Sequence, residues 1–119
     1  MDVTTGGDCK AVSEILSRVG DKWTIQVVVA LRPSPLRFNG IKRQVGGISQ
    51  QMLTRTLKTL ERDGLVERNV RHSTPPQVDY TLTTLGYSLS DTVRQLARWA
   101  TMHQGTIAAN RDDYDTRQM

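Results

Sequence analysis

The fold is decided by residues 48–64, ISQQMLTRTLKTLERDG. Leucines recur in this stretch at i, i+4 and i+7, on one face of an α-helix: Leu53, Leu57 and Leu60. Ser49 is a suitable N-cap because its hydroxyl can accept a free backbone N–H of the first turn, and Gly64 is a C-terminal stop. We therefore predict a helix that begins after Ser49 and ends near Asp63.

A shorter helix is predicted just before this one. Apolar side chains share one side of residues 38–45, and Gly46 and Gly47 then break the helix, since glycines adopt the backbone angles that a tight turn requires. Two helices joined by a short turn that contains glycine form a helix-turn-helix.

Two further helices are predicted upstream. Residues 10–19 carry apolar side chains at helical spacing: Val12, Ile15, Leu16 and Val19. Asp21 is a good N-cap for the next helix, which we expect to run to about Leu31. Its valines, residues 27–29, would also suit a strand, but the cap and the stop at Pro33 favour a helix.

A β-hairpin is predicted after Gly64. Residues 65–70 alternate apolar and charged side chains, and residues 78–82 place their large apolar side chains on one face. The loop between them, residues 71–76, is basic, polar and stiffened by two prolines. A hairpin directly after a helix-turn-helix is the wing of a winged helix.

Thr83 is an N-cap candidate for a long last helix that we expect to end near His103. Residues of this helix recur at alternating steps of four and three, which is typical of a helix that packs on another helix: Leu89, Val93, Leu96, Ala100 and His103. We assign this dimerisation seam to a homodimer, because a small core has little use for so long an appendage.

The predicted fold is α+β and mostly α: a winged helix-turn-helix with a two-stranded wing and a long C-terminal dimerisation helix. Residues 1–104 are expected to form a single domain that includes the N- and C-terminal dimerisation helices. Residues 105–119 are polar and mixed in charge, and are expected to be a flexible tail.

Basic residues concentrate in the middle of this chain, whose net charge is +4. Between Arg32 and His72 nine arginines and lysines stand against three acidic residues, whereas the flanking segments are near neutral. A basic middle on a balanced scaffold is typical of a surface that binds a polyanion.

The helix that follows Ser49 carries side chains that can read DNA. Glutamine can pair with adenine, arginine with guanine, and threonine can contact the methyl group of thymine. Four such residues form one exposed face, the recognition stripe: Gln51, Thr54, Arg55 and Lys58. Helix-turn-helix proteins place this helix in the major groove, so we predict binding to double-stranded DNA. The predicted DNA-binding residues are Arg37, Ser49, Gln50, Gln51, Thr54, Arg55, Lys58, Arg71, His72 and Ser73.

Several stretches, taken together and in this order, resemble the HxlR-type transcriptional regulators. They are Cys9, residues 20–24, 36–38, 48–54, 57–60, 63–66, 75–80 and 82–86. The resemblance implies a dimeric winged-helix DNA-binding regulator whose terminal helices make the dimer. One departure is Asn39-Gly40, where the family usually has an acidic residue and leucine. Glycine inside a helix costs about 1 kcal/mol relative to alanine, so we expect a shorter or looser first helix of the motif.

Cys9 stands where many members of that family carry a cysteine, and some of those sense oxidants or electrophiles through it. Lys10 would favour the thiolate and Asp8 would oppose it. Two interpretations therefore stay open: a thiol that senses an oxidant or small-molecule effector, and an ordinary thiol near the surface.

Other classes of protein find no support in the sequence. The histidines lack clustered metal ligands, and there is no phosphate loop, nucleophile elbow or acid–base pair, so we expect no metal, no cofactor and no enzymatic activity. There is no apolar run long enough for a membrane, and residues 1–10 lack the apolar core of a secretion signal. With a single cysteine, this predicts a cytoplasmic protein.

We expect a sequence-specific transcriptional regulator, more often a repressor in such architectures, that binds a roughly palindromic operator as a homodimer. One alternative is a sequence-tolerant architectural DNA-binding protein, which would lack a preference of about a thousandfold for its cognate site. Another is a winged-helix module whose basic face binds an acidic protein. The recognition stripe argues against that module, since protein binding does not require base-reading side chains.

Overall fold

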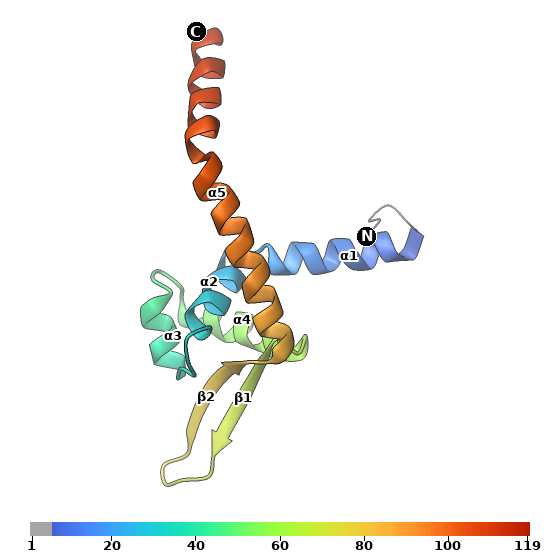
Figure 1. The fold of residues 1–119 in the computed structure, drawn as a ribbon. Helices are drawn as coiled ribbons and strands as arrows, with labels where there is room; N and C mark the ends of the chain where they lie inside the picture. The colour runs from blue at the N-terminus through green and yellow to red at the C-terminus, as the bar shows by residue number, and fades with distance from the viewer. Residues whose placement is uncertain (1–5) are drawn as a thin grey trace.

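The computed structural model describes residues 6–119 as helices and one small sheet (Figure 1). In chain order the elements are α1 (Gly6–Val19), α2 (Lys22–Leu31), α3 (Phe38–Gln44), α4 (Gln50–Arg62), β1 (Val66–Arg71), β2 (Gln77–Leu82) and α5 (Thr84–Arg117). This is the order of a winged helix-turn-helix with a long C-terminal helix, so the predicted fold class is confirmed.

The core lies where α2, α3 and α4 meet the base of the hairpin. Its buried apolar side chains are Val27, Val28, Ala30, Leu31, Ile41, Val45, Ile48, Leu53, Leu57, Leu60, Leu65, Val66 and Leu82. The valines that also suited a strand belong to helix α2, as preferred from the cap and the proline stop. Asp21 caps this helix by accepting the backbone N–H groups of Trp23 and Thr24 at 2.9 and 3.2 Å.

The predicted ends of the helix-turn-helix are also observed. The Ser49 hydroxyl accepts the backbone N–H of Met52 at 3.0 Å, and α4 begins at the next residue. After α4, Gly64 has a φ of +77°, a left-handed conformation that glycine adopts without strain. α3 forms across Gly40 despite the cost of glycine in a helix.

The wing is antiparallel, with Val66 opposite Leu82 and Arg68 opposite Tyr80. One feature of it was not predicted: Leu36 pairs with Tyr80 through two backbone hydrogen bonds of 2.8 and 3.1 Å. The segment between α2 and α3 thus pairs with β2 at a single residue, as an isolated antiparallel bridge at the edge of the sheet.

The predicted end of the last helix near His103 is wrong. α5 is 34 residues long and continues to Arg117, so residues 105–117, expected as a flexible tail, are helical. Alanines and arginines in this stretch favour a helix, no proline interrupts it, and Gly105 alone costs about 1 kcal/mol. Polarity therefore misled the prediction, because a polar sequence can still have high helix propensity.

Helices α1 and α5 project from the core in different directions (Figure 1). The radius of gyration is 18.0 Å, compared with about 13–14 Å expected for a compact chain of this length. Both helices leave large apolar side chains exposed, with Leu16 at 58% and Leu96 at 60% of their surface. In the part of the chain that the structure describes, no protein surface covers these apolar faces.

Replacing Gly40 with alanine should stabilise the fold. A Cβ at this position would lie 3.6 Å from Leu36 Cδ2, which is ordinary van der Waals contact. We expect Gly40→Ala to raise the free energy of unfolding by up to about 1 kcal/mol in urea denaturation. Gly47→Ala should do the opposite, because Gly47 has a φ of +87°. Destabilisation by Gly40→Ala would show that α3 needs glycine for another reason.

Candidate nucleic-acid interface

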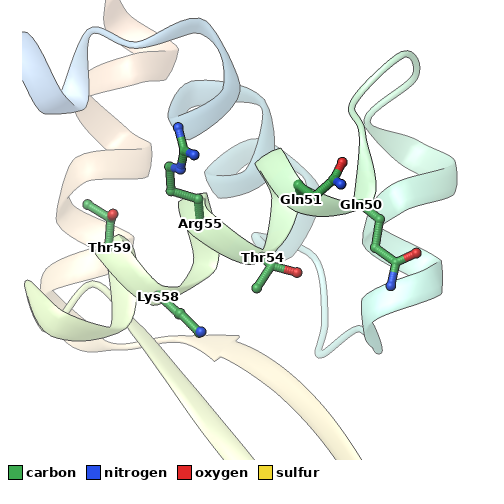
Figure 2. Close-up of a pocket in the computed structure, with 6 residues that line it drawn as sticks. All are labelled: Gln50, Gln51, Thr54, Arg55, Lys58 and Thr59. Carbon is green, nitrogen blue, oxygen red and sulfur yellow. The ribbon is translucent and has the colours of Figure 1, made fainter.

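Helix α4 divides its residues between the core and an exposed face. Its leucines are buried, and the opposite side lines one hollow on the surface (Figure 2). The lining residues are Gln50, Gln51, Thr54, Arg55, Lys58 and Thr59. The structure therefore brings together all four residues of the recognition stripe, as the helical spacing predicted. Thr59 was not predicted, although it lies one turn after Arg55.

The two cations of the recognition stripe point to opposite flanks of α4. Arg55 extends toward the side of α1 and α2, and Lys58 extends toward the wing (Figure 2). Thr54 is uncharged and exposed, and it lies on the same flank as Lys58 (Figure 2). The exposed face of α4 thus carries amide, hydroxyl and cationic groups, which are the groups that proteins use on base edges and phosphates in a major groove.

Arg68 is a basic residue near this surface that the site prediction missed. It lies on β1, and it lines a second hollow together with Thr54 and Lys58 of α4. Glu61 lines the same hollow and reduces its positive charge. A signal for Arg68 was available, because the residue belongs to the basic middle of the chain and faces the same side of the wing as Tyr80.

The predicted DNA-binding residues of the wing, Arg71, His72 and Ser73, lie away from α4 and differ in how strongly other residues of the wing hold their side chains. Arg71 Nη2 lies 3.7 Å from Asp79 Oδ2, but 71% of the Arg71 side chain is exposed, so this weak pair can open. His72 is exposed at the start of the turn. The Ser73 hydroxyl donates to the Pro75 carbonyl at 2.8 Å, so it shapes the turn.

Arg37 and Ser49 both have structural contacts. Arg37 precedes α3 and its Nη2 donates to Gln77 Oε1 of the wing at 2.8 Å, which ties the helix-turn-helix to β2. The Ser49 oxygen accepts the Met52 N–H, which leaves its O–H and one lone pair for a ligand. Of the ten predicted DNA-binding residues, these two thus also support the fold.

A groove runs between α1 and the Arg55 flank of α4. Lys10, Ser13 and Ser17 line it from α1, and Arg55 lines it from α4. Near the C-terminal end of α1, Arg18 Nη1 lies 3.0 Å from Asp63 Oδ1. Asp63 is the residue that directly follows α4. This ion pair joins α1 to the residue that caps the C-terminal end of α4.

Cys9 lies in the first turns of α1, next to Lys10, and its side chain is half-buried. It does not line the groove itself. In residues 6–119, no three or more histidine, cysteine, aspartate or glutamate side chains cluster as metal ligands would. Over the same residues no helix is both long and apolar enough to cross a membrane.

Comparisons with known proteins agree with this architecture. The HxlR-like helix-turn-helix family matches residues 18–107. YtfH of Escherichia coli K12, an uncharacterised HTH-type transcriptional regulator, is 38% identical over 100 residues, which cover 84% of this chain and 79% of that protein. Diamide-treated YodB of Bacillus subtilis superimposes with a TM-score of 0.70 at 35% identity, covering 79% and 93% of the two chains. The redox regulator HypR in its oxidised form superimposes with a TM-score of 0.70 at 37% identity, and the match covers 77% of this chain and 95% of HypR. This chain belongs to the HxlR-like helix-turn-helix family of transcriptional regulators.

Proposed function

We propose that this regulator binds a roughly palindromic operator as a homodimer and reads its sequence through α4. The observation that carries the proposal is the recognition stripe, which gathers base-reading side chains on the exposed face of a capped helix whose other face is core. The wing would lie along the flanking backbone or minor groove. We expect repression, because a dimer seated on an operator blocks access to the same DNA.

The proposed homodimer rests on the exposed apolar faces of α1 and α5. The dimerisation seam begins at half-buried Leu89 and passes through exposed Leu96, and none of residues 6–119 covers its outer part. Pairing two chains about a two-fold axis would bury this surface. It would also present two copies of α4 to successive major grooves, about 34 Å apart along B-DNA.

Selection of bound sequences from a random DNA pool tests the proposal. We expect an enriched site with two-fold symmetry and a preference over random DNA of about a thousandfold or more. An enriched site without symmetry would argue against the dimer. If no sequence is enriched although the protein binds DNA, the chain is an architectural protein. If it does not bind DNA at all, the basic face serves a protein partner.

Arg55 and Arg71 should differ in how they affect binding. Arg55→Ala should cost about 1–3 kcal/mol on the selected operator and relax the preference at one base position, because Arg55 belongs to the recognition stripe. Arg71→Ala should weaken binding to all sequences alike and reduce the salt dependence, as expected for a phosphate contact. Titration of cognate and scrambled duplexes measures both. An unchanged cognate-to-scrambled ratio in Arg55→Ala would contradict base reading.

We further propose that an oxidant or electrophile acts through Cys9. YodB and HypR, which share this fold, have been solved in diamide-treated and oxidised forms. Here α1 carries Cys9, lines a groove together with α4 and pairs through Arg18 with Asp63, the C-cap of α4, so a shift of α1 would alter the placement of α4. Modification of Cys9 must stabilise one placement of α4 more than the other, since a change with the same free energy in both conformations does not shift their equilibrium.

Replacing Cys9 with serine should remove the response to oxidant. We expect diamide to lower the operator affinity of the unmodified protein and to leave that of Cys9→Ser unchanged. Two chemical routes are open: a disulfide between the two Cys9 thiols, if their Cα atoms approach within about 7 Å, or an adduct with a small thiol or electrophile. Non-reducing electrophoresis separates these routes. Equal loss of binding in both proteins, or no loss in either, would exclude Cys9 from the mechanism.

A further inference from the structure

A polar contact joins the end of α2 to α5 through Arg32, the residue that directly follows α2. Arg32 Nη1 donates to Ser90 Oγ at 2.8 Å and lies 2.8 Å from Asp91 Oδ1. Ser90 is 1% exposed, so its hydroxyl lies between the two helices and out of solvent. Because this guanidinium nitrogen carries two N–H groups, one side chain can hold two neighbouring residues of α5.

We propose that Arg32 is a positioning residue: by holding Ser90 and Asp91 it fixes the direction of α5 relative to the helix-turn-helix, and thereby sets the half-site spacing that the regulator accepts. The inference rests on the proposed homodimer and its operator. It concerns the geometry that relates the two DNA-reading heads, through a residue that belongs neither to the recognition stripe nor to the dimerisation seam.

The structure holds α5 at two levels. At the start of the helix the Thr83 N–H donates to the Leu65 carbonyl at 3.1 Å, and buried Gly86 lies against the same residue. Arg32 holds the helix at residues 90–91, about 7 Å beyond Gly86 at about 1.5 Å per residue. Among residues 6–119, no other side-chain hydrogen bond or ion pair joins the helix-turn-helix to α5 after its first turn. Two attachments define the direction of a straight helix, and Arg32 supplies the second.

Apolar packing alone would leave this direction less well defined. Leu89 lies between the two attachments and packs against the core, but apolar contacts have no preferred direction. Hydrogen bonds weaken steeply when donor and acceptor are misaligned, so the contact of Arg32 restricts tilt. Beyond Val93 nearly every residue of α5 is exposed, so no packing further along the described helix opposes a tilt that begins here.

A small tilt of α5 has a large effect at the DNA. A displacement of about 1 Å at Ser90, at the end of a lever of about 7 Å, turns α5 by about 8°. Two recognition helices about 34 Å apart each lie about 17 Å from the two-fold axis. Turning each head by about 8° in the plane of the duplex changes their separation by about 4 Å, which exceeds the rise of about 3.4 Å per base pair. Loss of the Arg32 contact should therefore change the preferred half-site spacing.

A contact with a DNA phosphate is the competing role, since Arg32 belongs to the basic middle of the chain. However, the Arg32 side chain is only 31% exposed, and Asp91 offsets its charge. The Asp91 side chain is 62% exposed, so solvent screens the pair and the pair adds little to stability. The two roles predict opposite results for removal of Asp91. Spacing preference is lost if Arg32 positions α5, whereas binding to every duplex is strengthened if Arg32 holds a phosphate.

Titrations of the full chain with spacing variants of the selected operator test the inference. Three duplexes carry the two half-sites at the selected distance, one base pair closer and one base pair further apart, and a fourth duplex carries a single half-site. The variants are Arg32→Met, which keeps an apolar stem, and Asp91→Ala. Asp112→Ala is the matched control, because Asp112 is an exposed acidic residue of the same helix. Circular dichroism checks that each variant is folded, and Asp91→Ala alone decides the test if Arg32→Met is not.

We expect the unmodified protein and Asp112→Ala to prefer the selected spacing at least tenfold over either neighbouring spacing. Arg32→Met and Asp91→Ala should each reduce this ratio at least threefold or move the preferred spacing by one base pair, while affinity for the single half-site stays within twofold. The combined variant should change the ratio no more than either single variant, because both substitutions remove the same contact.

Three results would overturn the inference. If Arg32→Met weakens binding to all four duplexes alike and lowers the salt dependence, Arg32 is a phosphate contact. If Arg32→Met and Asp91→Ala both keep the full spacing preference, another contact sets the direction of α5, and the proposed function stands. If the unmodified protein has no spacing preference, the proposed homodimer on a two-fold operator is wrong as well.

Discussion

Leu96→Asp should release monomers and lower operator affinity by at least about a hundredfold. Leu96 lies at the centre of the dimerisation seam and exposes 60% of its surface in the single chain. A dimer that covers it would bury two unpaired carboxylates in the variant, at a cost of several kcal/mol, and each 1.4 kcal/mol is a factor of ten. A monomer holds only one half-site and so loses the contribution of the second α4.

Light scattering and DNA titration of one preparation measure both effects. Gln95→Asp is the matched control, since Gln95 is the exposed neighbour of Leu96 and lies off the seam. Gln95→Asp should leave the protein dimeric and its operator affinity within a few fold of that of the unmodified protein. A Leu96→Asp protein that remains dimeric would show that α5 does not pair through this face.

Gly86→Ala should be the most damaging small substitution in the chain. Gly86 is buried in the first turn of α5, and a Cβ there would clash with the carbonyl oxygen of Leu65. Neither partner can yield easily, because the obstructing atom is backbone and Thr83 holds the helix start by accepting the Gly86 N–H at 3.1 Å. We expect a loss of about 3 kcal/mol or more in the free energy of unfolding.

Gly105→Ala is the control for this substitution in the same helix. A Cβ at Gly105 would have no atom within 4 Å, so alanine should stabilise α5 by up to about 1 kcal/mol. Thermal unfolding followed by circular dichroism compares the two variants. If Gly86→Ala unfolds at the same temperature as the unmodified protein, α5 can shift on Leu65 without cost.

Local features of the sequence were sufficient for most of the fold. The caps at Asp21, Ser49 and Thr83 satisfy N–H groups two or three residues away, so their effect is visible in the sequence alone. Helical spacing likewise determined which face of α4 enters the core. It therefore also predicted that the recognition stripe would form one surface.

Tertiary contacts decided the rest, because they join residues that are far apart in the chain. The pairing of Leu36 with Tyr80 and the approach of Gly86 to Leu65 depend on how the elements dock, which no local pattern reports. Docking also placed Arg68 beside Lys58, and it engaged Arg37 with Gln77. By itself, then, the sequence determined the order of the helices, most of their ends and the exposed face of α4, since these depend on periodicity and capping. Only the tertiary structure decided that Arg37 is held by Gln77 and that Arg68 lines a hollow with α4, since both depend on how distant elements dock.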